Sequence, residues 1–202
     1  YYPLHYFGYE IYVKCPKCNS CAKITTLKEG YFNQREQSAK LNCKKCGHLS
    51  DSQKEWEGFY IGYAGQDYKG RSCGFCGSEF NYETKPTKKP FESELIKCNI
   101  CKNEKEYPIN WYRYYSEKPI DPYFGLDLYY TKEIKGETLW IYNKEHIQYL
   151  RDYLSSNIRK REYVGLYAMV SRLPDFITRA KNKTAITNQL NKFETEIIKN
   201  ET

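Results

Sequence analysis

Alternating large apolar and polar positions predict short strands throughout the first half of the chain. Residues 9–18 (YEIYVKCPKC) alternate in this way and end in a turn between two cysteines, and residues 20–27 (SCAKITTL) lead away as a second strand. The same order of strand, cysteine turn and strand recurs in residues 40–48, 71–83 and 94–108. Period-two alternation interrupted by turn residues is typical of antiparallel strands. The first half is therefore expected to form small antiparallel β-ribbons.

The second half changes to a hairpin followed by a helix. Residues 131–143 (TKEIKGETLWIYN) predict a β-hairpin whose turn lies near Lys135 and Gly136. Asn143 suits the N-cap of a helix that runs to about Glu162. The apolar stripe of this helix consists of Ile147, Leu150, Leu154 and Ile158.

Two further helices are expected before the end of the chain. Pro174 fits the first turn of a helix over residues 174–181. Thr184 suits the cap of a third helix, and its last few residues are expected to fray. The apolar residues of this helix recur at intervals of four, three and four: Ile186, Leu190, Phe193 and Ile197. Ribbons followed by a hairpin and helices make the predicted fold class α+β.

The cysteines carry the strongest chemical signal. Eight of the nine form four C-x2-C pairs: Cys15, Cys18, Cys43, Cys46, Cys73, Cys76, Cys98 and Cys101. Two thiolates at this spacing bind one ion from a single tight turn, here called a knuckle, and a second knuckle completes a tetrahedron. We therefore predict two structural zinc ions in closed sites that leave no position for a substrate. Iron in a rubredoxin-like site is the alternative.

Spacing also predicts how the knuckles pair. The first two pairs are separated by 24 residues and the last two by 21, so each ion is expected to lie between consecutive knuckles. An interleaved, cross-braced arrangement is the alternative. Sequential pairing divides the chain into zinc ribbon 1 (residues 1–66), zinc ribbon 2 (67–110) and a cysteine-free hairpin and helical module (111–202). Metal binding should drive folding, because neither ribbon alone has much core.

Other reactive side chains are interpreted as structural. Cys21 is the unpaired cysteine, and the sequence places no base beside it, so a small packed residue is favoured over a competing ligand or a nucleophile. His48 lies close enough to Cys46 to substitute as a ligand, but the cysteine set is complete, so a place beside the metal site or at the surface is favoured. His146 is expected in an exposed first helical turn. Paired carboxylates, a glycine-rich phosphate loop and a serine nucleophile motif are absent from the sequence. The protein is therefore predicted not to be an enzyme, with an unrecognised site as a remote alternative and no small-molecule substrate identified.

The amino-acid composition indicates a folded protein without membrane spans and a reducing compartment. Thirty-four aromatic residues, among them 22 tyrosines, supply the apolar surface that a folded chain needs. No apolar run approaches the roughly 20 residues of a membrane span, so no membrane partner is expected. No signal segment opens the sequence, whose first residue is Tyr1. Repeated C-x2-C pairs in a chain of this length indicate metal binding in a reducing cytoplasm rather than disulfides.

Clustered positive charge suggests a partner. The formal net charge of +7 falls to about +3 when each four-thiolate zinc site contributes two negative charges. Residues 151–183 contain only three acidic residues but eight basic ones: Arg151, Arg159, Lys160, Arg161, Arg172, Arg179, Lys181 and Lys183. Such a patch binds phosphates by releasing counterions. We therefore predict a nucleic-acid-binding accessory factor, with an adaptor that docks on a larger protein complex as the alternative.

The order of motifs resembles a family of bacterial tandem zinc-ribbon proteins of unassigned function. The two ribbons are followed by DPYFGL (residues 121–126) and then by a characteristic tail. The tail matches at Gly136, Glu137, Leu139, Trp140, Tyr142, Asn143, His146, Arg159, Arg161, Ser171, Arg172, Leu173, Pro174, Phe176, Ala180, Lys181 and Asn182. Thr131 to Ile134 replace a stretch that often contains cysteine or proline. The resemblance implies the architecture of ribbons and helical tail, without a third metal site.

Overall fold

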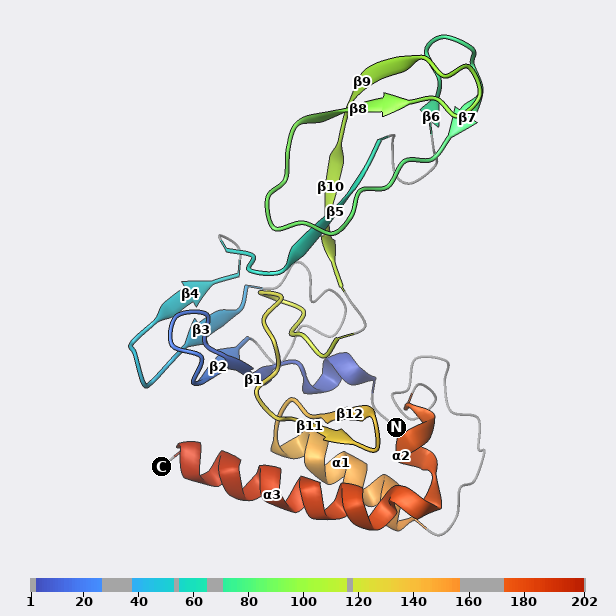
Figure 1. The fold of residues 1–202 in the computed structure, drawn as a ribbon. Helices are drawn as coiled ribbons and strands as arrows, with labels where there is room; N and C mark the ends of the chain where they lie inside the picture. The colour runs from blue at the N-terminus through green and yellow to red at the C-terminus, as the bar shows by residue number, and fades with distance from the viewer. Residues whose placement is uncertain are drawn as a thin grey trace. The chain divides into compact units, whose positions relative to one another are not determined.

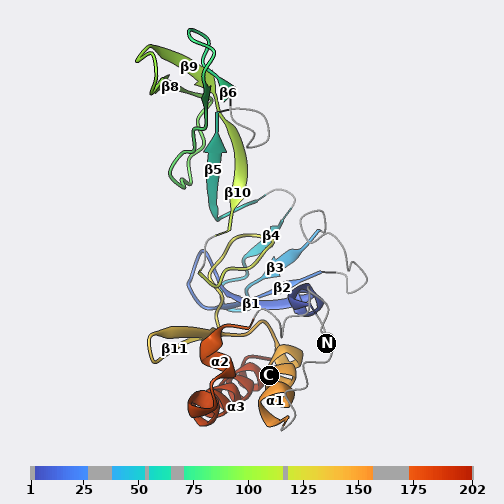
Figure 2. The ribbon, with the colours of Figure 1, turned by 90° about the vertical axis from the view of Figure 1, so that its right-hand side faces the viewer.

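The computed structural model describes residues 3–26, 38–52, 55–64, 71–115, 118–156 and 173–201. It is an α+β fold of mostly antiparallel strands with helices in the C-terminal part (Figures 1 and 2). The chain divides into two compact units. Unit 1 combines Tyr1–Trp56 with Glu117–Thr202, and unit 2 is Glu57–Ser116.

Unit 1 contains a four-stranded antiparallel sheet in the order β1-β2-β3-β4. Its register places Ile11 opposite Ile24, and Ile24 opposite Leu41. All three side chains are at most 1% exposed, so one face of the sheet forms part of the core. The strands are β1 (Glu10–Lys14), β2 (Cys21–Thr25), β3 (Lys40–Asn42) and β4 (Leu49–Asp51).

The C-terminal segments complete unit 1 around that face. Strands β11 and β12 form an antiparallel hairpin, in which Lys135 and Gly136 take up the left-handed turn conformation. Helices α1 and α3 lie side by side next to this hairpin (Figures 1 and 2). The elements are η1 (Leu4–Phe7), β11 (Thr131–Ile134), β12 (Glu137–Trp140), α1 (Lys144–Ser155), α2 (Asp175–Thr178), η3 (Ala180–Asn182) and α3 (Lys183–Glu201).

The predicted helical stripes are largely confirmed. The side chain of Asn143 accepts a hydrogen bond from the backbone N–H of His146 and caps α1, and Ile147 and Leu150 are buried. The prediction that this helix runs to about Glu162 is wrong, because α1 ends at Ser155 and the backbone of Ser156 is extended. Ile158 lies outside the described residues. In α3 the whole predicted stripe is buried: Ile186, Leu190, Phe193 and Ile197.

Two helix starts differ from their predictions. Helix α3 begins at Lys183, so Thr184 lies inside it rather than at its cap. Helix η3 runs directly into α3, and Lys183 already has helical dihedral angles, so a capping side chain is not needed at Thr184. Pro174 occupies the N-cap position of α2 instead of its first turn.

The expectation that the last residues fray is wrong up to Glu201. Tyr12 donates a hydrogen bond from its hydroxyl to the Glu201 carboxylate at 2.8 Å, and Lys144 pairs with the same carboxylate. Asn200 donates to the Tyr130 hydroxyl at 2.8 Å. The end of α3 is therefore attached to β1 and to the segment that precedes β11.

Unit 2 is a series of two-stranded antiparallel pairs with a small core. β5 pairs with β10, β6 with β7, and β8 with β9. Its described buried cluster consists of Ala64, Ile96, Tyr107 and Ile109. The strands are β5 (Phe59–Tyr63), β6 (Arg71–Ser72), β7 (Glu79–Phe80), β8 (Ser93–Lys97), β9 (Glu104–Pro108) and β10 (Asn110–Tyr114).

These two units differ from the three consecutive parts expected from the sequence (1–66, 67–110 and 111–202). The first ribbon packs with the C-terminal segments because β1 is hydrogen-bonded to them. The Tyr12 N–H donates to the Tyr142 carbonyl, and the Tyr129 N–H donates to the Tyr12 carbonyl. The strands β5 and β10 flank the second ribbon and pair with each other, which makes unit 2 an insertion within unit 1.

Candidate metal centres

All four C-x2-C knuckles have the same backbone hydrogen bonds. In the first, the N–H of Cys15 donates to the carbonyl of Ser20 at 2.8 Å, and the N–H of Asn19 donates back to the carbonyl of Cys15 at 2.9 Å. Equivalent pairs of bonds close the knuckles that begin at Cys43, Cys73 and Cys98. This tight turn holds both cysteine side chains of a knuckle on one side.

The residue after each second cysteine has a left-handed backbone. Its φ angle is 58° at Asn19, 70° at Gly47, 70° at Gly77 and 64° at Lys102. Glycine adopts this conformation without strain and asparagine tolerates it. In lysine the Cβ atom comes too close to the following carbonyl oxygen, which costs free energy. Lys102 departs from the glycine pattern in sequence but keeps the same turn, and its ammonium donates to the Asn99 carbonyl at 2.7 Å.

The knuckles pair sequentially. The first cluster is formed by Cys15, Cys18, Cys43 and Cys46, and the second by Cys73, Cys76, Cys98 and Cys101. Within each cluster all four Sγ atoms lie within 4.8 Å of one another. The interleaved alternative is thereby excluded, and each cluster could hold one metal ion.

The sulfur spacing fits a tetrahedral ion. Sγ atoms are separated by 3.7 Å between Cys15 and Cys46 and by 3.5 Å between Cys18 and Cys43. The second cluster gives 3.7 Å for Cys73 with Cys101, and 3.8 Å for Cys76 with Cys98. Metal–sulfur bonds of about 2.3 Å at tetrahedral angles place two sulfurs about 3.8 Å apart. The donor set and its geometry therefore match closed four-thiolate coordination.

Hydrogen bonds favour the thiolate form that a metal needs. The backbone of Ser20, and then its side chain, lower the pKa of the Cys18 thiol to about 6. The Cys101 backbone and then the Ser78 side chain lower the pKa of the Cys98 thiol to about 6. The Ser78 side chain also lowers the pKa of the Cys76 thiol. Because a thiolate is the binding species, these contacts prepare one sulfur of the first cluster and two sulfurs of the second for an ion.

Cys21 and His48 are not members of either cluster, although the Cys43 thiol lies 3.9 Å from the carbonyl oxygen of Cys21. Cys21 lies on β2, half-buried, and burial raises the pKa of its thiol to about 11, which reduces its nucleophilicity at neutral pH. His48 also lies outside both clusters, and its backbone carbonyl closes the second knuckle.

His146 corrects the prediction of an exposed side chain. It is 1% exposed and stacks on Phe7 with ring centroids 5.0 Å apart. Its Nδ1 accepts a hydrogen bond from the Tyr142 N–H at 3.2 Å, and its Nε2 has no partner among the described residues. Burial lowers the pKa of His146 to about 3, so the imidazole is neutral. The fold brings η1 over the first turn of α1, which the sequence did not indicate.

The predicted basic patch is only partly described. Arg159, Lys160, Arg161 and Arg172 lie outside the described residues. Arg151 pairs with the Glu194 carboxylate at 2.7 Å and donates to Asn191, so it ties α1 to α3. Arg179 lies 3.9 Å from Asp175, and Lys181 and Lys183 are exposed.

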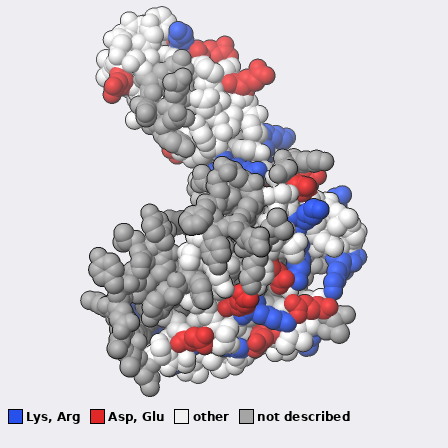
Figure 3. All heavy atoms as spheres, turned by 180° about the vertical axis from the view of Figure 1, so that it is seen from behind, with Lys and Arg blue, Asp and Glu red and all other residues white. Residues whose placement is uncertain are grey.

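A second basic surface was missed from the sequence. The residues inside the first two knuckles include the exposed Lys17, Lys44 and Lys45. In the sequence, two adjacent lysines lie between the cysteines of residues 43–46 (CKKC) and indicate this surface. The prediction considered only the cysteines of these motifs. On the face of unit 1 in Figure 3, basic and acidic side chains are interspersed, so local clusters matter more than net charge.

Comparisons with known proteins do not assign the chain to a family. No family model matches the chain, no curated protein matches it, and no solved structure matches it. The resemblance to bacterial tandem zinc-ribbon proteins therefore stays a prediction. Among the described residues, no helix is both long enough and apolar enough to cross a membrane.

Proposed function

We propose that the protein is a non-catalytic zinc-ribbon protein that binds nucleic acid through its first ribbon. Zinc is the metal that suits four thiolates in a closed tetrahedron. Two ions, one per cluster, would be structural, because each cluster already supplies four ligands. The first ribbon then serves as a rigid platform for the side chains carried by its knuckles.

The observation that carries this proposal is a contrast between equivalent positions. The residue two places after the first cysteine of each knuckle is Lys17 or Lys45 in the first cluster, and Phe75 or Ile100 in the second. All four side chains are exposed. The same scaffold thus presents cations in unit 1 and apolar groups in unit 2. Cations fixed at the surface neutralise phosphates and release counterions.

The first-ribbon lysines suit this role better than Arg151 and Arg179, the two arginines of the C-terminal patch that the structure describes. Within the described chain, Lys45 has no ion pair, whereas Arg151 is paired with Glu194 and Arg179 lies near Asp175. A paired cation must give up its partner before it can bind a phosphate. We therefore place the principal phosphate contact at the knuckles of the first ribbon.

Fluorescence anisotropy with labelled single- and double-stranded DNA and RNA between 50 and 300 mM salt tests the proposal. Wild-type affinity should fall as salt rises. The double variant Lys17→Glu with Lys45→Glu should bind at least tenfold more weakly to all sequences and with a smaller salt slope. The matched variant Lys181→Glu with Lys183→Glu reverses the same charge on exposed residues of the C-terminal patch.

The outcomes separate the two basic surfaces. Weaker binding in the knuckle variant alone supports the proposal, and weaker binding in the C-terminal variant alone moves the contact to residues 151–183. If the wild type binds no nucleic acid at low salt, the nucleic-acid function is wrong. Elemental analysis of each protein should find two zinc ions per chain, and a value near one would contradict the two-site arrangement.

A second function, a protein-interaction adaptor, is favoured by the apolar knuckles of unit 2. Phe75 is 58% exposed and Ile100 is 70% exposed, and Leu95 on β8 is 63% exposed. Exposed apolar groups of this kind are typical of contact surfaces. Affinity capture with the wild type and with the double variant Phe75→Ser plus Ile100→Ser tests the adaptor function. A specific partner protein should be captured by the wild type and not by the variant.

A further inference from the structure

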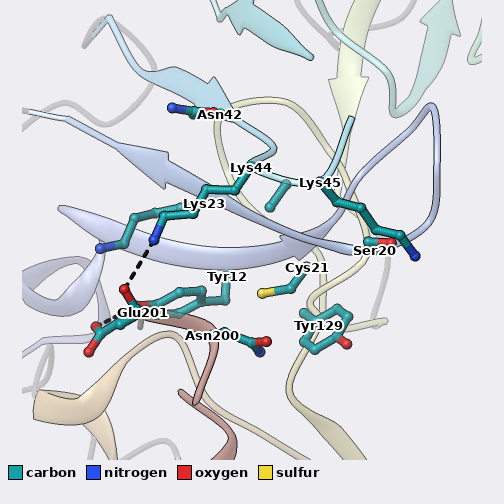
Figure 4. Close-up of a pocket in the computed structure, with 11 residues that line it drawn as sticks. Tyr12, Ser20, Cys21, Lys23, Asn42, Lys44, Lys45, Tyr129, Asn200 and Glu201 are labelled. Carbon is teal, nitrogen blue, oxygen red and sulfur yellow. Dashed lines mark hydrogen bonds between the residues drawn. The ribbon is translucent and has the colours of Figure 1, made fainter. Parts of the chain in front are cut away.

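A pocket of about 640 Å³ lies beside the first metal cluster, entirely within unit 1 (Figure 4). Pockets that hold small ligands measure about 300–1,000 Å³. Its walls come from β1, β2, the second knuckle and the end of α3. The lining residues that carry polar or aromatic groups are Tyr12, Ser20, Cys21, Lys23, Asn42, Lys44, Lys45, Tyr129, Asn200 and Glu201.

One end of this pocket is already occupied by internal interactions. Lys44 donates to the Glu201 carbonyl at 3.1 Å, and Tyr12 donates to the Glu201 carboxylate at 2.8 Å. Lys144, outside the pocket, lowers the pKa of the Glu201 carboxyl and balances its charge. Lys23 pairs with Glu10 at 2.7 Å. A ligand gains little at this end, because these charges have partners.

The other end offers a cation, a hydroxyl and an aromatic ring. In Figure 4 the Lys45 side chain extends toward Ser20, at the end of the pocket that Cys21 and Tyr129 line. Tyr129 is half-buried and its backbone is fixed by the hydrogen bond from its N–H to Tyr12. Its ring stands edge-to-face against Tyr130, with centroids 5.2 Å apart. The ring of Tyr129 is thus packed against Tyr130 and also lines the pocket.

We propose that this pocket takes one nucleotide of a single-stranded nucleic acid. The phosphate lies at Lys45 and Ser20, and the base packs on the ring of Tyr129. The inference rests on the proposed nucleic-acid function and specifies the form of its ligand. A lysine and a hydroxyl are donors suited to phosphate oxygens, and every base has a flat face that stacks on an aromatic side chain.

The geometry selects single strands over duplexes. In a duplex both faces of a base are covered by its neighbours, so none is free for a tyrosine within a pocket. Recognition of single strands relies instead on bases that leave the stack and pack on aromatic residues.

The test compares a ten-nucleotide oligo(dT) with its duplex, oligo(dT)·oligo(dA), by anisotropy at 50 mM salt. Wild type should bind the single strand at least tenfold more tightly. Tyr129→Leu should reduce that affinity about tenfold while duplex affinity stays the same, and Tyr129→Phe should retain binding because the ring remains. Phe75→Leu is the matched control, because it removes an exposed ring in unit 2.

Photocrosslinking provides a measurement on the unaltered protein. An oligonucleotide that carries 5-iodouracil should crosslink to Tyr129 when irradiated, and mass spectrometry of the digested protein should locate the adduct there. If wild type binds nucleic acid but prefers duplex, crosslinks only elsewhere, or is insensitive to Tyr129→Leu, the pocket inference is wrong and the proposed function stands. Absence of all nucleic-acid binding would instead overturn the proposed function.

Discussion

At the scale of single residues, polar side chains hold segments distant in sequence together. The Asn143 amide donates to the backbone carbonyls of Phe7 and Glu10, at 2.8 and 2.9 Å, while its oxygen caps α1. Asp121 is fully buried and accepts hydrogen bonds from the backbone N–H groups of Tyr123, Phe124 and Leu126. Residues of the DPYFGL and tail motifs therefore have structural roles that explain why they are polar.

The buried imidazole of His146 makes the stability of unit 1 depend on pH. Its pKa is about 3 in the folded chain and about 6.5 when unfolded, so the unfolded state binds a proton first as the pH falls. The contribution of His146 to the free energy of unfolding should be constant above about pH 6.5. It should decrease below that by up to about 1.4 kcal/mol per pH unit until about pH 3.

Denaturant unfolding of wild type and His146→Gln between pH 4 and 8 isolates this effect, because both proteins keep the same cysteines and carboxylates. The wild type should lose stability relative to the variant as the pH decreases from 6.5. A stability difference that stays the same across this range would show that the imidazole is not buried in its neutral form.

These residues also show which site features the sequence could predict. The ligand cysteines were predictable because their chemistry depends on a local spacing of two residues. Burial of His146 was not, because Phe7, which stacks on it, lies at the other end of the chain. The pocket beside the first cluster was missed for the same reason, since it combines Lys45 with Tyr129.

At the scale of elements, the pairing of β5 with β10 requires a residue without a side chain at Gly62. A Cβ atom there would lie 2.4 Å from Ile109 Cγ2 and 2.9 Å from the Trp111 ring. The Gly62 N–H also donates to the Thr84 hydroxyl at 3.0 Å. Gly62→Ala should therefore lower the free energy of unfolding of unit 2 by about 1–3 kcal/mol, measured by thermal or denaturant unfolding of the metal-loaded protein.

Gly74→Ala serves as the control for that substitution. A Cβ atom at Gly74 would meet only the flexible end of the Lys105 side chain, at 3.0 Å from Nζ. Stability close to wild type is expected. Equal losses in both variants would show that backbone flexibility, rather than the close approach at Ile109, explains the effect.

Elements with a regular apolar repeat were the easiest to predict. The apolar stripe of α3 predicted the correct buried face, because its four side chains recur at the helical period between Ile186 and Ile197. The boundary was less predictable, since η3 extends the helix backward and Asn182 fixes that turn by donating to the Phe176 carbonyl at 2.8 Å. The sequence around Thr184 carries no sign of this contact.

At the scale of the whole molecule, the two units differ in the size of their cores, so we expect their folding to depend on metal to different extents. Unit 1 has an extensive buried core, whereas the described core of unit 2 consists of Ala64, Ile96, Tyr107 and Ile109. Metal-binding free energy adds directly to folding free energy. Removal of metal with a chelator should therefore unfold unit 2 while α1 and α3 of unit 1 keep their structure.

Hydrogen exchange of the chelated protein, analysed by peptide, measures this difference. Peptides from residues 71–115 should lose most of their protection, and peptides covering α3 should keep theirs. Protection that persists throughout unit 2 without metal would contradict a structural role for its cluster. The division into units was not predictable from cysteine spacing, because it depends on hydrogen bonds between β1 and segments beyond residue 116.

The attachment of the end of α3 to β1 has a consequence for synthesis on the ribosome. Domains generally fold as units while the chain emerges. Unit 2 is complete once residue 116 has emerged, whereas the first ribbon must wait for α3, whose Asn200 and Glu201 bind Tyr130 and Tyr12. The first ribbon therefore acquires its core after the second ribbon, although it precedes the second ribbon in the sequence.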